Sequence, residues 1–318
     1  MILVLRALGV GDLATAAPAL RALRAAHPDR ELVLAAPGWL APLVELVGGG
    51  VDRLVPTDGL GRPGSALRAP RVAVNLHGRG PESHRMLAGT RPGRLLAYAS
   101  PEAGHRDGPD WRADEHEVDR WCRLLDWYGI PADRADLDLL RPAPGDVPTG
   151  VTVLHPGSKV PAKRWPPGRF AALARELAAR GHRVVLTGSP DERATAQRIA
   201  AGAGLPADAV LAGRTDLGRL AALVAYARVV VSGDTGVAHL ATGYRTPSVV
   251  LFGPVSPARW GPPPGRARHR ALWAGGQGWP RWDGVGSHPT LAAIGVDEVV
   301  AAVDEVERAV RVSGAVAA

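Results

Sequence analysis

Arg141-Pro-Ala-Pro-Gly-Asp-Val-Pro-Thr-Gly150 separates two halves of the sequence that follow the same pattern. The segment is rich in Pro and Gly and has no hydrophobic periodicity, which is typical of a linker. Directly after it, Val151–His155 is an apolar run that predicts a new strand. The chain has 318 residues, which is long for one hydrophobic core and sufficient for two domains.

Short apolar runs alternate with amphipathic segments in the first half. The predicted strands there are Ile2–Leu5, Leu32–Ala35, Arg53–Val55, Val72–Leu76 and Arg94–Ala97. The predicted helices there are Leu13–Ala26, Ala41–Val47 and Glu115–Tyr128.

The second half repeats this alternation. Its further predicted strands are Arg183–Thr187, Ala209–Ala212, Val229–Ser232 and, as the last one, Ser248–Phe252. Its predicted helices are Pro167–Arg180, Asp191–Ala201, Asp216–Ala227 and Val296–Val312, while the Gly-, Pro- and Trp-rich segment 253–287 carries no predicted element. Strands separated by helices form parallel sheets covered on both faces, so we expect an α/β fold of two doubly wound, Rossmann-like domains.

Composition excludes several classes of protein. Hydrophobic residues make up 46% and charged residues 22%, as in a globular protein, and no apolar run approaches the length of a membrane span. The N-terminal apolar run is short and reads as a buried strand rather than a signal peptide. The single cysteine, Cys122, allows no intrachain disulfide and fits a reducing compartment. The formal charge is +7, but the arginines are spread evenly without basic blocks, so we expect no nucleic-acid partner.

Lysine is confined to one loop. Of 38 Lys and Arg residues only Lys159 and Lys163 are lysine, and both follow the strand that ends at His155. An ammonium is compact and can follow a moving phosphate, whereas a guanidinium is a planar fork. With the hydroxyl of Ser158 and the backbone N–H groups near Gly157, this loop is a candidate phosphate site, although a solvated basic loop has the same composition.

Other loops at predicted strand ends carry candidate polar groups, because ligands of open parallel sheets bind beyond the carboxyl ends of the strands. Asp12 follows Gly9 and Gly11, and by itself it is as readily explained as a helix cap. The turn lacks a third glycine of a dinucleotide fingerprint, which disfavours a dehydrogenase. Glu192 is either a helix-start residue or a ribose ligand.

The stretch Gly233-Asp-Thr-Gly-Val-Ala-His239 opens a short helix whose N–H groups can meet an anion. Thr235 and Gly236 are placed to approach phosphates, and Asp234 to accept hydrogen bonds from sugar hydroxyls, although a simple cap explains Asp234 equally well. Asp136-Leu-Asp138 has a metal–diphosphate spacing but follows no strand, so we interpret it as chance. His and Cys show no metal-ligand spacing.

Taken in order, these motifs resemble the glycosyltransferase family that contains the ADP-heptose heptosyltransferases of lipopolysaccharide core synthesis, glycosyltransferase family nine. The matching segments are Arg6…Gly11-Asp12…Thr15…Pro18-Ala-Leu20, His116-x-Val-Asp-Arg120, His155-Pro-Gly157, Lys163-Arg-Trp-Pro166, Gly233-Asp-Thr-Gly-x-x-His239 and Leu251-Phe-Gly-Pro254 with Pro257-x-Arg-Trp-Gly261.

The resemblance implies the GT-B architecture, in which two Rossmann-like domains face each other across a cleft. It implies an N-terminal acceptor-binding domain at 1–145 and a C-terminal domain at 146–295 that binds the nucleotide-sugar donor. The helix in 296–318 commonly crosses back to the first domain in this family. The implied reaction is inverting and independent of metal, with no cofactor beyond an ADP-linked sugar.

The resemblance also implies roles for individual residues. Asp12 would be the general base, and Lys163 would stabilise the diphosphate leaving group. The implied donor-binding residues are Ser158, Lys159, Glu192, Asp234, Thr235, Gly236 and His239. The acceptor-side candidates are Arg6, Asn75 and His77, of which the last two lie in a segment that resembles the family only loosely.

We therefore expect the acceptor to be a lipopolysaccharide-core-like saccharide, a lipid-linked molecule or a soluble metabolite. We expect a cytoplasmic protein, and the sequence leaves peripheral contact with a membrane open. Two alternatives from other classes are a nicotinamide-dependent oxidoreductase and a non-catalytic nucleotide-sugar or carbohydrate-binding protein. The incomplete glycine fingerprint disfavours the first of these, and the joint presence of Asp12 and Lys163 disfavours the second.

Overall fold

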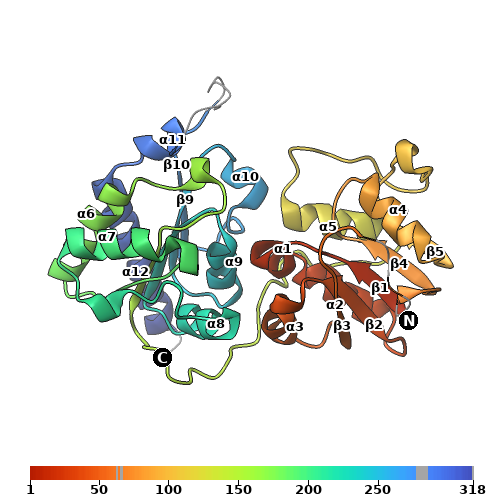
Figure 1. The fold of residues 1–318 in the computed structure, drawn as a ribbon, viewed down its shortest axis with the longest axis horizontal. Coiled ribbons are helices and arrows are strands. Elements are labelled where there is room, and N and C mark those ends of the chain that lie inside the picture. Colours follow the sequence, from red (N-terminus) through yellow and green to blue (C-terminus); the bar gives the residue numbers. More distant parts are fainter. Residues whose placement is uncertain (62–63, 65–66, 277–285, 317–318) are drawn as a thin grey trace. The chain divides into compact units, whose positions relative to one another are not determined.

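The chain, seen in a computed structural model, divides into two compact units, Met1–Leu140 and Arg141–Ala318 (Figure 1). The structure describes all residues except 62–63, 65–66, 277–285 and 317–318. The division falls at the first residue of the predicted linker, a few residues before the predicted boundary at 145. Part of the Gly-, Pro- and Trp-rich segment 253–287 lies outside the described residues.

The first unit contains a five-stranded parallel sheet in the order β3-β2-β1-β4-β5. Its strands are β1 (Ile2–Leu5), β2 (Leu32–Ala36), β3 (Arg53–Pro56), β4 (Val72–Asn75) and β5 (Arg94–Leu96). The central strand β1 is buried along its whole length, as expected for a parallel strand covered on both faces. All five strands were predicted to within a residue or two.

The helices of this unit are α1 (Val10–Thr15), α2 (Ala17–Ala26), α3 (Ala41–Val47), α4 (Glu82–Gly89) and α5 (Glu117–Trp127). The single helix predicted over Leu13–Ala26 is in fact two helices. Pro18, in the first turn of α2, is the reason, since proline has no N–H and is tolerated only where a helix begins. Helix α2 packs against α1 and α5, and α4 packs on β4.

The second unit repeats this architecture with a parallel sheet in the order β10-β9-β8-β6-β7. Its strands are β6 (Thr152–His155), β7 (Val184–Leu186), β8 (Val229–Gly233), β9 (Ser248–Phe252) and β10 (His269–Trp273). The prediction that Ser248–Phe252 is the last strand was wrong. Strand β10 is a partly exposed edge strand within a Gly- and Pro-rich segment, so its sequence gives no continuous apolar run. The strand predicted at Ala209–Ala212 is reduced to one bridge between Leu186 and Val210.

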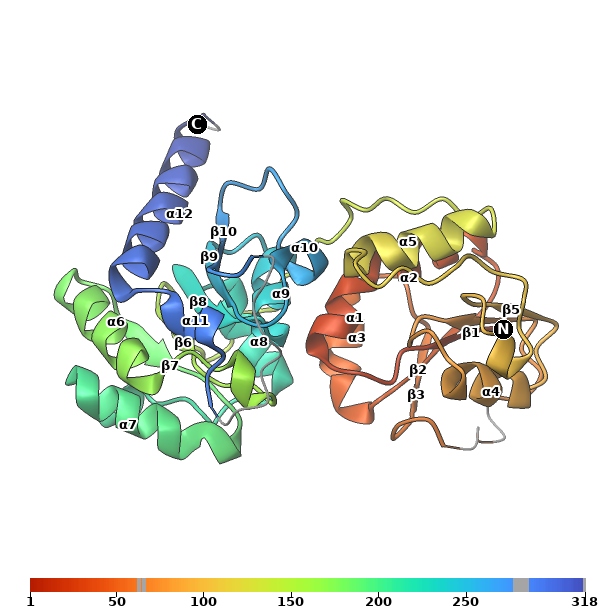
Figure 2. The ribbon, with the colours of Figure 1, turned by 90° about the horizontal axis from the view of Figure 1, so that it is seen from above.

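The helices of the second unit are α6 (Pro167–Ala179), α7 (Arg193–Ala203), α8 (Leu217–Ala225), α9 (Gly236–Gly243), α10 (Pro257–Trp260), α11 (Pro289–Ala293) and α12 (Val296–Val316). Helix α12 packs on α6, β9 and β10 of its own unit (Figure 2). The Arg228 guanidinium holds it there through both carboxylate oxygens of Glu307, at 2.6 and 2.8 Å. That it crosses to the first unit stays a prediction.

The α/β fold class with two doubly wound parallel sheets is thus confirmed. In both units the central strand, β1 or β8, ends in a glycine-containing turn that opens a helix. The predicted functional residues lie at or beyond the carboxyl ends of these two strands and of β4, β6 and β7.

Candidate active site

Asp12 lies in the first turn of α1, just beyond the carboxyl end of β1. Its Oδ2 accepts a hydrogen bond from the backbone N–H of Gly9 at 3.0 Å, so Asp12 does cap the N-terminus of this helix. Its side chain nevertheless stays 27% exposed, with one oxygen toward the Arg6 guanidinium at 3.5 Å. The cap and a reactive carboxylate are therefore compatible in one residue.

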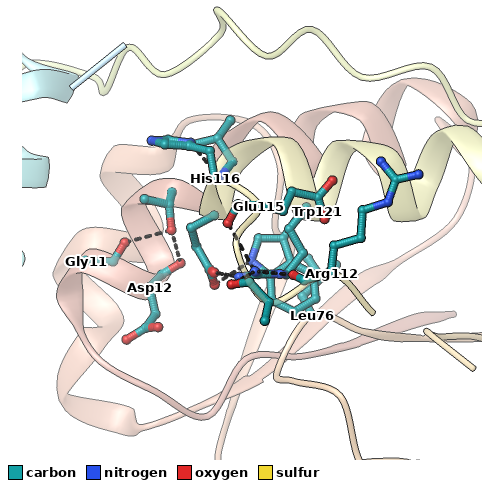
Figure 3. A network of polar contacts seen from close by, with 12 residues as sticks. Gly11, Asp12, Leu76, Arg112, Glu115, His116 and Trp121 are labelled. Atoms are coloured by element: carbon teal, nitrogen blue, oxygen red, sulfur yellow. Dashed lines mark hydrogen bonds and ion pairs between the residues drawn. The ribbon is translucent and has the colours of Figure 1, made fainter. Parts of the chain in front are cut away.

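Beneath Asp12 lies a buried polar network that joins β1 to α5 (Figure 3). The Arg6 side chain is 1% exposed and donates from Nε to the Asp12 carbonyl at 2.9 Å and from Nη2 to Glu117 Oε1 at 2.9 Å. A further donor of Arg6 meets the Leu76 carbonyl. The guanidinium lies 4.7 Å from the centroid of the Trp121 ring. Arg6 is thus enclosed by its own unit. The structure does not support the prediction that Arg6 contacts an acceptor directly.

Asn75 is also enclosed. It is fully buried, with its amide nitrogen on the Gly78 carbonyl, Ser83 Oγ and His84 Nδ1, and its oxygen accepting from the His77 N–H. Asn75 therefore shapes the turn after β4 rather than presenting its amide to a ligand.

His77 is the partly exposed member of the predicted acceptor-side group. Its Nδ1 is buried and has no hydrogen-bond partner among the described residues. Burial lowers the pKa of His77, the nearby Arg6 charge lowers it further, and Asp12 opposes the shift. The lowered pKa favours the neutral imidazole of His77, and its buried Nδ1 lacks a hydrogen-bond partner among the described residues.

In the second unit, Lys163 and Asp234 form an ion pair. Lys163 ends the 3₁₀ turn Pro161–Lys163 after β6, and Asp234 follows β8. The Nζ–Oδ2 distance is 2.6 Å, and the lysine side chain is 25% exposed against 6% for the aspartate. Gly233 permits this approach, because a Cβ there would press on the Lys163 carbonyl.

The rest of the lysine loop is a tight turn. Ser158 is buried, its Oγ accepts from the Val160 N–H at 3.2 Å, and its carbonyl accepts from Arg164 Nε at 2.7 Å. Lys159 is exposed. The loop thus has one lysine fixed by a carboxylate and another that reaches into solvent.

Glu192 lies against the backbone of Gly157. Its Oε2 accepts from the Ser189 N–H at 2.8 Å, so the helix-start interpretation holds, and a Cβ at Gly157 would overlap its carboxylate. His155, which the sequence did not single out as a site residue, pairs through Nδ1 with Thr187 Oγ1 at 2.9 Å. Burial lowers the pKa of His155, and Glu192 opposes the shift.

The turn after β8 presents unused hydrogen-bonding groups. Thr235 stands at the N-cap position of α9 without a side-chain cap. Its Oγ1, like the Oγ of Ser232, is buried without a hydrogen-bond partner in the part of the chain that the structure describes. Gly236 begins α9. His239, one turn further, packs edge-on against Trp260 with ring centroids 5.6 Å apart. Buried hydroxyls beside a helix N-terminus are suited to phosphate oxygens.

The Asp-x-Asp motif has a structural partner. Arg21 donates to the carboxylate of Asp136 at 2.5 Å and to its carbonyl at 2.8 Å, and also reaches the carbonyl of Asp138. Within the described residues, no group of three or more His, Cys, Asp or Glu side chains could hold a metal ion. Over the same residues, no helix is both long enough and apolar enough to cross a membrane.

The sequence of the end of the first unit and of most of the second matches a known protein family. Residues 110–278, more than half of the chain, match the family described as glycosyltransferase family 9 (heptosyltransferase). The chain belongs to glycosyltransferase family 9. The matched range covers Glu117 and the whole Lys163 and Asp234 region, whereas Asp12 lies outside it.

Individual members of the family are similar over part or all of the chain. Lipopolysaccharide heptosyltransferase 2 of Escherichia coli is 38% identical over 106 residues, 32% of this chain and 30% of that protein. Lipopolysaccharide heptosyltransferase 1 of Pseudomonas aeruginosa is 37% identical over 151 residues, 45% of this chain and 41% of that protein. These matches thus span less than half of the relatives' own length. The structure of E. coli ADP-heptose lipopolysaccharide heptosyltransferase II superimposes with a TM-score of 0.79 at 24% identity, covering 98% of this chain and 99% of that one, and supports the fold.

Proposed function

We propose that this protein is an inverting, metal-independent glycosyltransferase that moves a heptose, or a related sugar, from an ADP-linked donor to an acceptor hydroxyl. We further propose that the first unit binds the acceptor and the second unit binds the donor. The observation that carries the proposal is the part-exposed carboxylate of Asp12, held at the end of the central strand by a backbone N–H and a buried guanidinium.

Asp12 supplies the base that such a reaction needs. One of its oxygens takes the proton of the acceptor hydroxyl while the acceptor oxygen forms a bond to the anomeric carbon. The bond from that carbon to the donor phosphate breaks, and its electron pair leaves with the ADP. A single displacement of this kind inverts the anomeric centre, and general-base assistance typically contributes about 10²–10⁴-fold.

Lys163 and the turn after β8 supply the stabilisation of the leaving group. Negative charge grows on the ADP phosphates as the bond breaks, and preorganised cations and N–H donors lower the barrier at that moment. Lys163 is partly exposed and can move from Asp234 toward a phosphate. The hydroxyl of Thr235 and the N-terminus of α9 are the neighbouring donors. Asp234, relieved of its ammonium, can then accept from sugar hydroxyls, and Glu192 from the ribose.

The names of the matched relatives support heptose as the sugar and lipopolysaccharide core as the setting. The acceptor is a lipopolysaccharide-core-like saccharide or a soluble metabolite, and the protein acts in the cytoplasm.

The test is a donor screen followed by a transfer assay. A ligand of the folded state raises the melting temperature, so ADP-heptose and ADP should shift it, whereas UDP-, GDP- and dTDP-sugars should not. Release of ADP that depends on a core-saccharide acceptor would then establish transfer. A shift by NAD without one by ADP-heptose would favour an oxidoreductase. Binding of ADP-heptose without transfer to any acceptor would favour the non-catalytic binding protein.

A further inference from the structure

Glu117, in the first turn of α5, is a buried carboxylate with three cationic or polar donors around it. It is 5% exposed. Its Oε1 accepts from Arg6 Nη2 and from Trp121 Nε1, each at 2.9 Å, and its Oε2 accepts from Arg120 Nη1. Burial alone would raise the pKa of Glu117, but Arg6 and Arg120 lower it below its usual value, so the group is an anion.

Such a network is a costly way to stabilise a fold. Taking charges out of water is expensive, and replacing a buried ion pair by apolar residues is often neutral or stabilising. Arg120 adds to the cost, since it is 3% exposed and stacks 4.2 Å from the centroid of the Trp111 ring. The network therefore calls for an explanation beyond stability.

The geometry of Arg6 offers that explanation. Its Nη2 is shared between two carboxylates, Glu117 Oε1 at 2.9 Å and Asp12 Oδ1 at 3.5 Å. The shorter contact is to the buried carboxylate, and the longer one is to the part-exposed carboxylate. Arg6 is also held in place by the Trp121 ring and by the Leu76 carbonyl, both visible with Asp12 in Figure 3.

We propose that Glu117 is a positioning residue that acts on Asp12 through Arg6. It neutralises the guanidinium and keeps it at a distance from the Asp12 carboxylate, so that Asp12 is oriented but not locked in a full ion pair. A carboxylate fully paired with arginine is a weaker base, because the positive charge favours its ionised form. This inference rests on the proposed function, in which Asp12 takes the acceptor proton.

The test is Glu117→Gln, which keeps the size of the side chain and removes its charge. Arg6 then has one carboxylate partner left, Asp12. We expect kcat to fall about 10- to 100-fold, the scale of coupling in charged networks, while KM for the ADP-sugar donor changes less than about twofold. A merely structural role would instead lower the amount of folded enzyme and leave kcat per folded molecule unchanged.

Glu115→Gln is the matched control. Glu115 lies two residues away and accepts from Arg123 at 2.6 and 2.7 Å, without contact to Arg6. This variant loses an ion pair of the same region, so its melting temperature should fall while kcat is retained. If Glu117→Gln has the same kcat as Glu115→Gln, the inference is wrong.

Two further variants keep the test decisive. If Glu117→Gln does not fold, Trp121→Phe keeps the aromatic ring and removes one donor to Oε1. It should lower kcat about two- to fivefold with donor KM unchanged, and an unchanged kcat would overturn the inference. Asp12→Asn separates the two claims. Full activity of Asp12→Asn refutes the proposed base itself, whereas an inactive Asp12→Asn beside a fully active Glu117→Gln refutes only the role of Glu117.

Discussion

At the end of the central strand β1, the carboxylate of Asp12 meets the guanidinium of Arg6, and at the end of the central strand β8, the carboxylate of Asp234 meets the ammonium of Lys163. The partners are exposed in the opposite order. In the first unit the cation is 1% exposed and the carboxylate 27%, whereas in the second the cation is 25% exposed and the carboxylate 6%. The same fold therefore turns a carboxylate outward in one unit and an ammonium outward in the other.

The two ion pairs also differ in the distance between carboxylate and cation. Asp12 is 3.5 Å from its cation, which lies closer to Glu117 at 2.9 Å, and Lys163 is 2.6 Å from its anion. A loosely paired carboxylate is ready to take a proton before any substrate arrives. A tightly paired ammonium has to exchange its partner, and a donor diphosphate can displace Asp234. The first unit is therefore preorganised, and the second is expected to rearrange when the donor binds.

Asp12→Asn should have the largest effect, because it removes the outward base of the first unit and nothing from the second. We expect kcat to fall about 10²–10⁴-fold, with ADP affinity changed less than about twofold. Single-turnover rates and ADP titration by calorimetry would measure the two quantities. A large loss of ADP affinity would contradict the separation of roles between the two units, since Asp12 would then also contribute to donor binding.

Lys163→Ala should have the second-largest effect on kcat. Removal of the outward charge of the second unit should lower kcat about 10²–10³-fold and weaken donor binding less, because the negative charge on the leaving group is larger in the transition state than in the bound donor. Lys163→Arg is the sharper control, since it keeps the charge but exchanges a flexible ammonium for a planar fork. Arginine should restore only part of the rate, and full restoration would show that any cation suffices.

His269 allows a test of the pH-dependent stability of the second unit alone. Its Nδ1 pairs with Ser248 Oγ at 2.9 Å, and burial lowers its pKa from 6.5 to about 4. The unfolded chain binds the proton more readily, so stability is full above pH 6.5 and falls as the pH drops toward 4. The wild type should lose on the order of 3 kcal/mol more than His269→Asn between pH 7 and pH 4. Urea unfolding at the two pH values would measure this difference, and equal losses in the two proteins would refute it.

The smallest effect is expected from chelation. If Lys163 and the α9 N-terminus supply the positive charge, then EDTA should leave kcat within about 20% of the untreated value, with a dialysed sample as control. A loss that Mg²⁺ restores would show that the second unit needs a metal ion in addition to its ammonium.

The fold could be predicted from sequence because parallel strands buried on both faces are continuous apolar runs, as Ile2–Leu5 and Ser248–Phe252 illustrate. The edge strand His269–Trp273 could not, since only two of its five side chains are buried. The break between α1 and α2 was missed although Pro18 marks it, because the apolar periodicity continues across the proline.

The candidate site was predictable only in part. Glycine-containing turns after strands located Asp12 and Asp234, and the confinement of lysine to one loop located Lys163. Nothing in the sequence shows that Lys163 and Asp234 pair across 71 positions. Glu117 was the unspecified residue of the motif His116-x-Val-Asp-Arg120. Its importance depends on contact with Arg6, 111 positions away, and such a contact is set by tertiary packing and not by local spacing.

The close fit of Gly157 against Glu192 constrains how this chain could be redesigned. Even one methyl group at position 157 would occupy the space of the Glu192 carboxylate, which would have to move. A library that enlarges residue 157 would therefore also move Glu192, the proposed ribose ligand, so effects on donor choice at the two positions have to be read together.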